Sequence, residues 1–214
     1  MTNSKSTKRA LIISVLAIFM CVAMLIGTTF AWFTDTASTG VNKIQAGNLD
    51  VKLMYSTDMQ TWKEATEQTK LFDDNALWEP GYTQVVYLKV VNAGNLALKY
   101  ETGFSKDYTS NRGKNVNGGW YRVDNYLKIG TAETTTKFEN REAVWSAIAA
   151  NERTLAKDVM LTDGWITLKP RQESAPFAVA IYMPTSVGNE ANASRLRPSS
   201  VSGLGIEVRA TQAT

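Results

Sequence analysis

The side chains that most often carry enzyme chemistry are scarce in this chain. Its 214 residues include no histidine and one cysteine, Cys21. Histidine-based metal sites, Ser-His-Asp and Cys-His catalysis and histidine pH switches are therefore excluded. Cys21 follows Phe19 and Met20, whereas a lipidated cysteine needs small residues just before it. We therefore expect neither a catalytic cysteine nor a lipid anchor.

Oxygen ligands offer the next possibility. Asp73-Asp74-Asn75 is the one tight oxygen cluster, but the glycine and glutamate of a calcium-binding EF-hand loop do not follow it. We expect a solvated loop or helix cap there, with calcium as the alternative. Four glutamates could be paired on paper as glycosidase carboxylates, but nothing in their spacing places two of them together: Glu79, Glu101, Glu173 and Glu190.

Tryptophans could form a carbohydrate platform, and the chain has six. Most have apolar neighbours in the sequence, which favours core packing over ligand stacking. From these residue types we predict no enzyme, no catalytic residue, no metal site and no cofactor.

The N-terminus has the pattern of an export segment. Residues 1–9 are polar and basic, and the next 24 residues, Ala10 to Phe33, carry no charge. A basic segment before an apolar run is typical of a secretory signal. Thr29-Phe30-Ala31 fits a small-x-small cleavage site, with cleavage between Ala31 and Trp32. The alternative is an uncleaved membrane anchor, because about 20 residues suffice to span a bilayer.

The charge balance excludes one class of partner. The formal net charge of +3 comes from Lys5, Lys8 and Arg9, so residues 32–214 carry equal numbers of basic and acidic residues. A neutral domain gives no electrostatic reason to bind nucleic acid.

Alternating apolar and polar residues predict a chain of strands with one clear helix. The spacing predicts a helix from Asn140 to about Ala150, because Asn140 can cap it and Val144 and Ile148 share one face. Residues 92–95 (Asn-Ala-Gly-Asn) lie between two apolar runs and predict a hairpin. The predicted strands are 48–55, 82–91, 96–101, 165–168, 176–183 and 204–210.

This pattern predicts a mainly β fold, an antiparallel sandwich with one or two inserted helices, preceded by the apolar segment. No linker divides residues 47–210. We therefore divide the chain into a signal peptide at 1–31, an N-terminal arm at 32–46 and a sandwich domain at 47–214.

Three segments resemble the TasA/camelysin family of exported proteins. The first runs from Gly27 to Asp35 and continues in Ile44–Val51. The second begins at Glu79-Pro80-Gly81 and ends in the 90–99 stretch VVNAGNLALK. The third combines Tyr182-Met183-Pro184, Gly188–Asn192 and Ala210-Thr211-Gln212.

The resemblance implies a jelly-roll sandwich that is cleaved by a SipW-type signal peptidase of a Gram-positive bacterium. It implies secretion to the cell surface or extracellular matrix and self-association into biofilm matrix fibres, with other matrix proteins as further partners. Camelysin-like relatives have been called metallopeptidases, but this chain has no histidine and no HExxH motif. Zinc peptidases depend on such ligands, so a peptidase is the weakest alternative.

The arm is the candidate assembly element. In the fibre subunits that the sequence resembles, the freed N-terminal segment adds as a strand to the next subunit. The candidate anchors are Trp32, Phe33, Val41 and Ile44. Two other interpretations stay open, since the stretch could pair within its own subunit or be a remnant of the leader. A membrane-anchored surface binding module is the alternative function.

Overall fold

The computed structural model describes residues 14–20, 34–38, 41–42, 49–105 and 107–213, and only the backbone of 34–38 and 41–42. The chain divides into two compact units, Met1–Phe33 and Thr34–Thr214. In the first unit, residues 14–20 form a helix with exposed side chains. Among the described residues, no helix combines the length and the apolar character that crossing a membrane requires.

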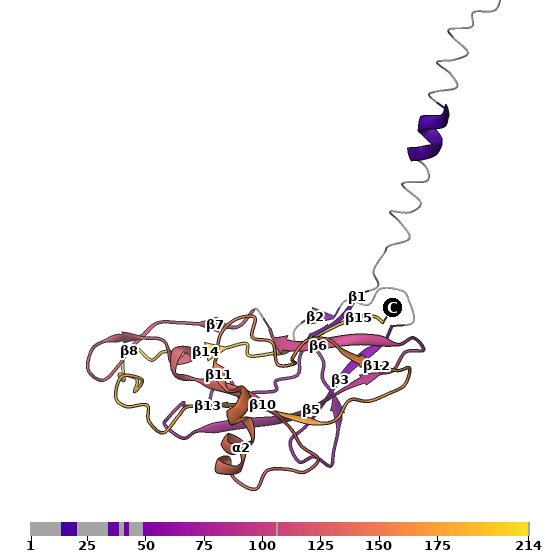
Figure 1. Ribbon diagram of the computed structural model, residues 1–214. Coiled ribbons are helices and arrows are strands. Elements are labelled where there is room, and N and C mark those ends of the chain that lie inside the picture. The colour runs from indigo at the N-terminus through magenta and orange to yellow at the C-terminus, as the bar shows by residue number, and fades with distance from the viewer. Residues whose placement is uncertain (1–13, 21–33, 39–40, 43–48, 106, 214) are drawn as a thin grey trace, which may run out of the picture. The chain divides into compact units, whose positions relative to one another are not determined.

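The second unit is a sandwich of two antiparallel sheets, drawn one above the other in Figure 1. The first sheet has the order β12 (Ile166–Leu168), β6 (Leu98–Phe104), β15 (Ile206–Gln212), β1 (Thr34–Ser38) and β2 (Val41–Asn42). The second has the order β11 (Arg153–Thr154), β10 (Lys128–Glu133), β13 (Phe177–Tyr182), β5 (Thr83–Asn92), β3 (Val51–Ser56) and β4 (Lys63–Glu64).

Short elements fill the connections. Two small ribbons pair β7 (Thr109–Ser110) with β14 (Val201–Ser202) and β8 (Gly113–Lys114) with β9 (Trp120–Tyr121). The helical pieces are η1 (Val123–Tyr126), α2 (Arg141–Ile148) and η2 (Ala149–Asn151). From β5 onward, successive long strands alternate between the two sheets, as in a jelly roll. The predicted fold class is confirmed.

The core lies between the sheets and follows from the period-2 pattern. In β3, Val51 and Leu53 are buried, while in β15 Ile206, Val208 and Ala210 are buried. These side chains meet in one apolar cluster that draws on both sheets. Every buried apolar residue described lies between Leu49 and Ala210. The unit from Thr34 to Thr214 therefore contains the core it needs to fold without residues 1–33.

Strand β13 is buried on both faces, because α2 covers the face that the sandwich does not. Phe177, Val179 and Ile181 belong to the core between the sheets, whereas Ala180 and Tyr182 pack against α2. The predicted helix cap is confirmed, since the Asn140 side chain accepts a hydrogen bond from the Ala143 amide.

The predicted hairpin at residues 92–95 is wrong. β5 lies in the second sheet and β6 in the first, so the connection is an arch between the layers. The buried Asn92 side chain explains the arch, because its amide donates to the carbonyls of Leu96, Leu168 and Lys169. Its oxygen accepts from the Gly94 amide. Asn92 therefore ties the ends of three strands together where the chain changes sheets.

Candidate assembly edge

The segment from Thr34 to Asn42 forms the margin of the first sheet. β1 pairs antiparallel with β15 over five residue pairs, from Thr34 opposite Thr211 to Ser38 opposite Glu207. β2 folds back on β1, with Ala37 opposite Asn42 and Ser38 opposite Val41. In a single chain, the described part of the arm thus pairs within its own subunit, which is one of the interpretations that the sequence left open.

The structure describes only some of the residues that were predicted for export and assembly. Val41 lies in β2, at the outer edge of the first sheet. The cleavage residues Thr29, Ala31 and Trp32 and the anchors Phe33 and Ile44 lie outside the described residues. The arm predicted from the sequence contains Thr34–Ser38, but none of the predicted anchors lies in this pairing segment. The available signal was the alternation of Thr34 and Thr36, since β-branched residues favour strands.

β15 is a suitable acceptor for a strand because its inward side chains lie in the core and its other edge is already paired with β6. Val208 and Ala210 are fully buried in the core, and β6 pairs with the other edge of β15 along Ile206–Gln212. Arg209 points away from the core and lies near Glu101 and Glu207, with N–O distances of 3.6 and 3.4 Å. A second strand along this edge needs only main-chain hydrogen bonds in register.

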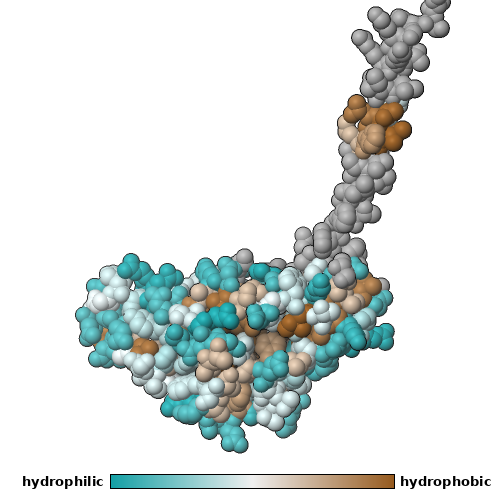
Figure 2. All heavy atoms as spheres, viewed as in Figure 1, coloured by the Kyte–Doolittle hydropathy of each residue, from teal (hydrophilic) through white to brown (hydrophobic). Residues whose placement is uncertain are grey.

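The opposite margin of the first sheet borders a cleft between the layers. The cleft has a volume of about 520 Å³ and lies between β12 of the first sheet and β10 and β13 of the second. Figure 2 shows hydrophilic side chains over most of one face of the sandwich and hydrophobic ones along its middle. The cleft is lined by residues that include Tyr100, Glu133, Arg153, Asp163, Leu168, Glu173, Ser174 and Phe177.

The cleft is chemically mixed. Burial raises the pKa of the Tyr100 phenol, so this side chain stays neutral. Glu173 forms an ion pair with Lys89, with the Nζ and Oε2 atoms 2.6 Å apart. The remaining walls combine apolar Leu168 and Phe177 with carboxylates. Such a pocket can hold a ligand or an added strand, but its residues form no nucleophile–base pair.

Three of the four glutamates considered from the sequence have separate protein partners for their carboxylates. Glu101 lies near Arg209, Glu173 near Lys89, and Glu190 accepts a hydrogen bond from the Gly188 amide. Asp74 lies 3.2 Å from Lys70 and also accepts from the Gly203 amide. Within the part of the chain that the structure describes, no group of three or more Cys, Asp or Glu side chains could hold a metal ion.

The expectation that tryptophans pack in the core is wrong for two of them. Trp120 is 52% exposed and Trp165 is 48% exposed. Trp145 instead stacks on Tyr182 with ring centroids 5.1 Å apart and donates to the Thr83 hydroxyl. Apolar neighbours in the sequence do not reveal which face of a short strand or loop is covered.

Comparison with protein-family models, curated proteins and solved structures finds no match.

Proposed function

We propose that this chain is a secreted structural protein of the cell surface or biofilm matrix, and that its subunits join by exchanging the segment that contains β1 and β2. The observation that carries the proposal is the pairing of β1 with β15 at the margin of the first sheet. The exchanged strand is the first of the sandwich unit, directly after the apolar N-terminal region.

Strand exchange between subunits uses the same edge of β15 that pairs with β1 in the single chain. A β1 strand from a neighbour can form the same ladder with β15 that the chain's own β1 forms, so little free energy separates the two arrangements. The link between subunits is head to tail, because the donor segment and the acceptor edge are different parts of the chain. A head-to-tail link that does not close into a ring gives a filament.

Signal-peptide cleavage is the switch in this proposal. While the leader remains, the arm is tethered at the membrane and cannot reach a neighbour. Cleavage after Ala31 by a SipW-type signal peptidase frees the arm outside the cell. The partners are then further copies of this chain and other matrix proteins.

The cleft between the sheets favours a second candidate, a surface binding module held by an uncleaved anchor. Its volume of about 520 Å³ lies in the range of small-molecule sites. Assembly separates the two candidates, because a binding module remains monomeric without its arm and with it.

The proposal is tested by comparing residues 32–214 with residues 47–214 by light scattering and electron microscopy. We expect filaments only from the longer chain, and a synthetic 32–46 peptide should block their growth. A matched pair of variants of the longer chain sharpens the test. Ala37→Pro removes a strand amide and should suppress assembly, whereas Ala37→Ser leaves the backbone unchanged and should not. Equal assembly of all these chains would refute strand exchange.

A further inference from the structure

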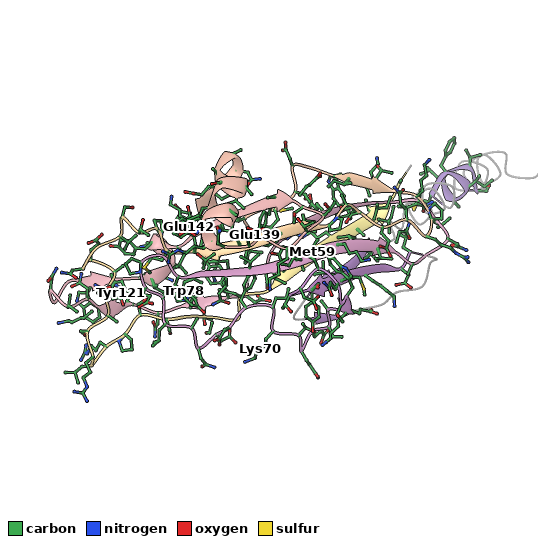
Figure 3. The ribbon with its side chains drawn as sticks, turned by 90° about the horizontal axis from the view of Figure 1, so that it is seen from below. Met59, Lys70, Trp78, Tyr121, Glu139 and Glu142 are labelled. Atoms are coloured by element: carbon green, nitrogen blue, oxygen red, sulfur yellow. The ribbon has the colours of Figure 1, made fainter. Side chains whose placement is uncertain are left out.

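Two tight turns lie side by side at one end of the sandwich. In the turn between β8 and β9, the buried Asn115 side-chain oxygen accepts hydrogen bonds from the amides of Asn117 and Gly119. In the second turn, the Arg197 amide donates to the Ser194 carbonyl. Figure 1 places β8 at one end of the sandwich and β1 and β2 towards the other, and Figure 3 places Tyr121 of β9 near one end.

Backbone contacts hold the two turns together. Lys114 donates its amide to the Arg197 carbonyl and accepts from the Ser194 amide, at 2.8 Å each. A Cβ at Gly113 would lie 2.3 Å from the Ser199 nitrogen, so glycine is required for this close approach. We call the surface formed by residues 112–120 and 194–197 the turn platform. Hydrogen bonds within each turn and between the two turns fix the backbone of this surface.

The turn platform presents apolar side chains that no described part of the chain covers. Leu196 is 90% exposed, Val116 is 54% exposed and Trp120 is 52% exposed. Leu196 occupies a central position of its turn, between Arg195 and Arg197. Aliphatic groups at the tips of two adjacent turns are arranged to enter an apolar phase together.

The charge of the turn platform has one sign. Residues 111–120 and 191–202 contain four cations, Arg112, Lys114, Arg195 and Arg197, and no aspartate or glutamate. Within the described part of the chain, none of these four cations forms an ion pair. Three of them surround the Trp120 ring, at 5.2 to 5.9 Å from its centroid. Cation–π attraction thus gathers positive charge around the exposed tryptophan.

We propose that the turn platform docks on the surface of an anionic lipid bilayer. Leu196 and Val116 enter the boundary between headgroups and acyl chains, and Trp120 lies at headgroup level, where indole rings concentrate. The four cations remain among the phosphates, which attract basic groups near a membrane. The exposure of the Leu196 side chain favours a bilayer over a soluble polyanion, because a charged polymer has no apolar phase for an aliphatic side chain.

Vesicle flotation of residues 34–214, the unit that contains the whole described core, tests the proposal. Assembled protein sediments on its own, whereas protein floats only when it is bound to vesicles. The unit should bind phosphatidylcholine vesicles that contain about one third phosphatidylglycerol and not vesicles of phosphatidylcholine alone. Binding should weaken as salt is raised. Arg195→Gln and Arg197→Gln should each weaken binding about fivefold, and Leu196→Ser about tenfold.

Matched controls exist at the same level of exposure. Leu77 is 87% exposed and lies outside the turn platform, so Leu77→Ser should leave vesicle binding unchanged, as should Lys137→Gln. The proposal is overturned if Leu196→Ser binds like the unaltered unit. It is equally overturned if the unit binds soluble acidic polysaccharide or DNA but not anionic vesicles. The outcome is independent of strand exchange, which these variants do not alter.

Discussion

Thr102 is the described residue whose buried side-chain oxygen has no hydrogen-bond partner. It lies in β6 and is fully buried opposite Val208 of β15. A buried hydroxyl without a partner costs desolvation free energy that a methyl group of the same shape does not. We therefore expect Thr102→Val to raise the free energy of unfolding by about 1 kcal/mol.

Chemical denaturation measures this change, with Thr102→Ser as the control. Serine keeps the hydroxyl and loses the methyl group, so Thr102→Ser should lower the free energy of unfolding by about 1 kcal/mol. A less stable Thr102→Val protein would mean that the hydroxyl has a partner in solution.

The ionised form of the Asp58 side chain is stabilised by hydrogen bonds from residues close to it in the sequence. Hydrogen bonds to its carboxylate from the amides of Thr61 and Gln60, and then from the Ser56 hydroxyl, lower the pKa of Asp58 well below its usual range. Because the folded pKa is lowered, the stabilisation is complete above the unfolded pKa of about 4. It is lost as the pH falls towards the folded pKa.

This predicts a pH-dependent difference between the unaltered protein and Asp58→Asn. The unaltered protein should be more stable at neutral pH, and its advantage should shrink below about pH 4. Thermal melts across this range measure the difference, and carboxyl NMR gives the midpoint directly. An Asp58 midpoint near its ordinary value would contradict the hydrogen-bond geometry.

At the scale of elements, α2 lies close to β10 because the β10 residue that faces Ile148 of α2 is Gly130. A Cβ at Gly130 would lie 2.7 Å from the Cβ of Ile148, so Gly130→Ala must push α2 away. Overpacking of this kind lowers the free energy of unfolding by about 1–3 kcal/mol. In an Ile148→Gly background the same substitution should cost much less, because the Cβ that it meets is then absent. Equal costs in both backgrounds, measured by denaturation, would place α2 elsewhere.

Elements with a strong local pattern could be predicted from the sequence. β3, β13, β15 and α2 lie where alternation, a cap or an apolar stripe indicated them. The arch after β5 could not be predicted, because Asn92 binds the carbonyl of Leu168, far along the chain. A Gly-Asn turn has the same local appearance in a hairpin and in an arch.

The candidate site was less predictable than the fold. Pairing of β1 depends on β15, the last strand of the chain, and no local pattern specifies a partner so distant. The turn platform was missed because Trp120 and Leu196 become a surface only when two separate turns meet.

At the scale of the whole molecule, the two proposals concern opposite ends of the sandwich. Figure 1 shows β8 apart from β1 and β2, so the proposed filament growth and the proposed membrane docking do not compete for one surface. Residues 32–214 have no net charge, so the four cations of the turn platform, which form no ion pair among the described residues, give the sandwich one positively charged end.

Export should release a chain that begins at Trp32. The uncharged run behind a basic segment, ended by Thr29-Phe30-Ala31, is the basis of this expectation. N-terminal sequencing of extracellular material measures it. A chain that begins near residue 1 and is extracted only by detergent would favour the anchored binding module.

Strand exchange is tested most directly by cysteine pairing across the β1–β15 ladder. Thr34 lies opposite Thr211, and residues 32–214 contain no cysteine. Opposed residues of antiparallel strands have Cα atoms about 4.5–5.5 Å apart, within reach of a disulfide. In a single unassembled chain, the Thr34→Cys and Thr211→Cys double variant should form an intrachain disulfide.

The decisive measurement mixes chains that carry only Thr34→Cys with tagged chains that carry only Thr211→Cys, lets them assemble, and oxidises them. Strand exchange predicts covalent pairs of one tagged and one untagged chain, abundant in filaments and rare in the unassembled mixture. Filaments without these mixed pairs, in which the double variant still closes its own disulfide, would contradict strand exchange.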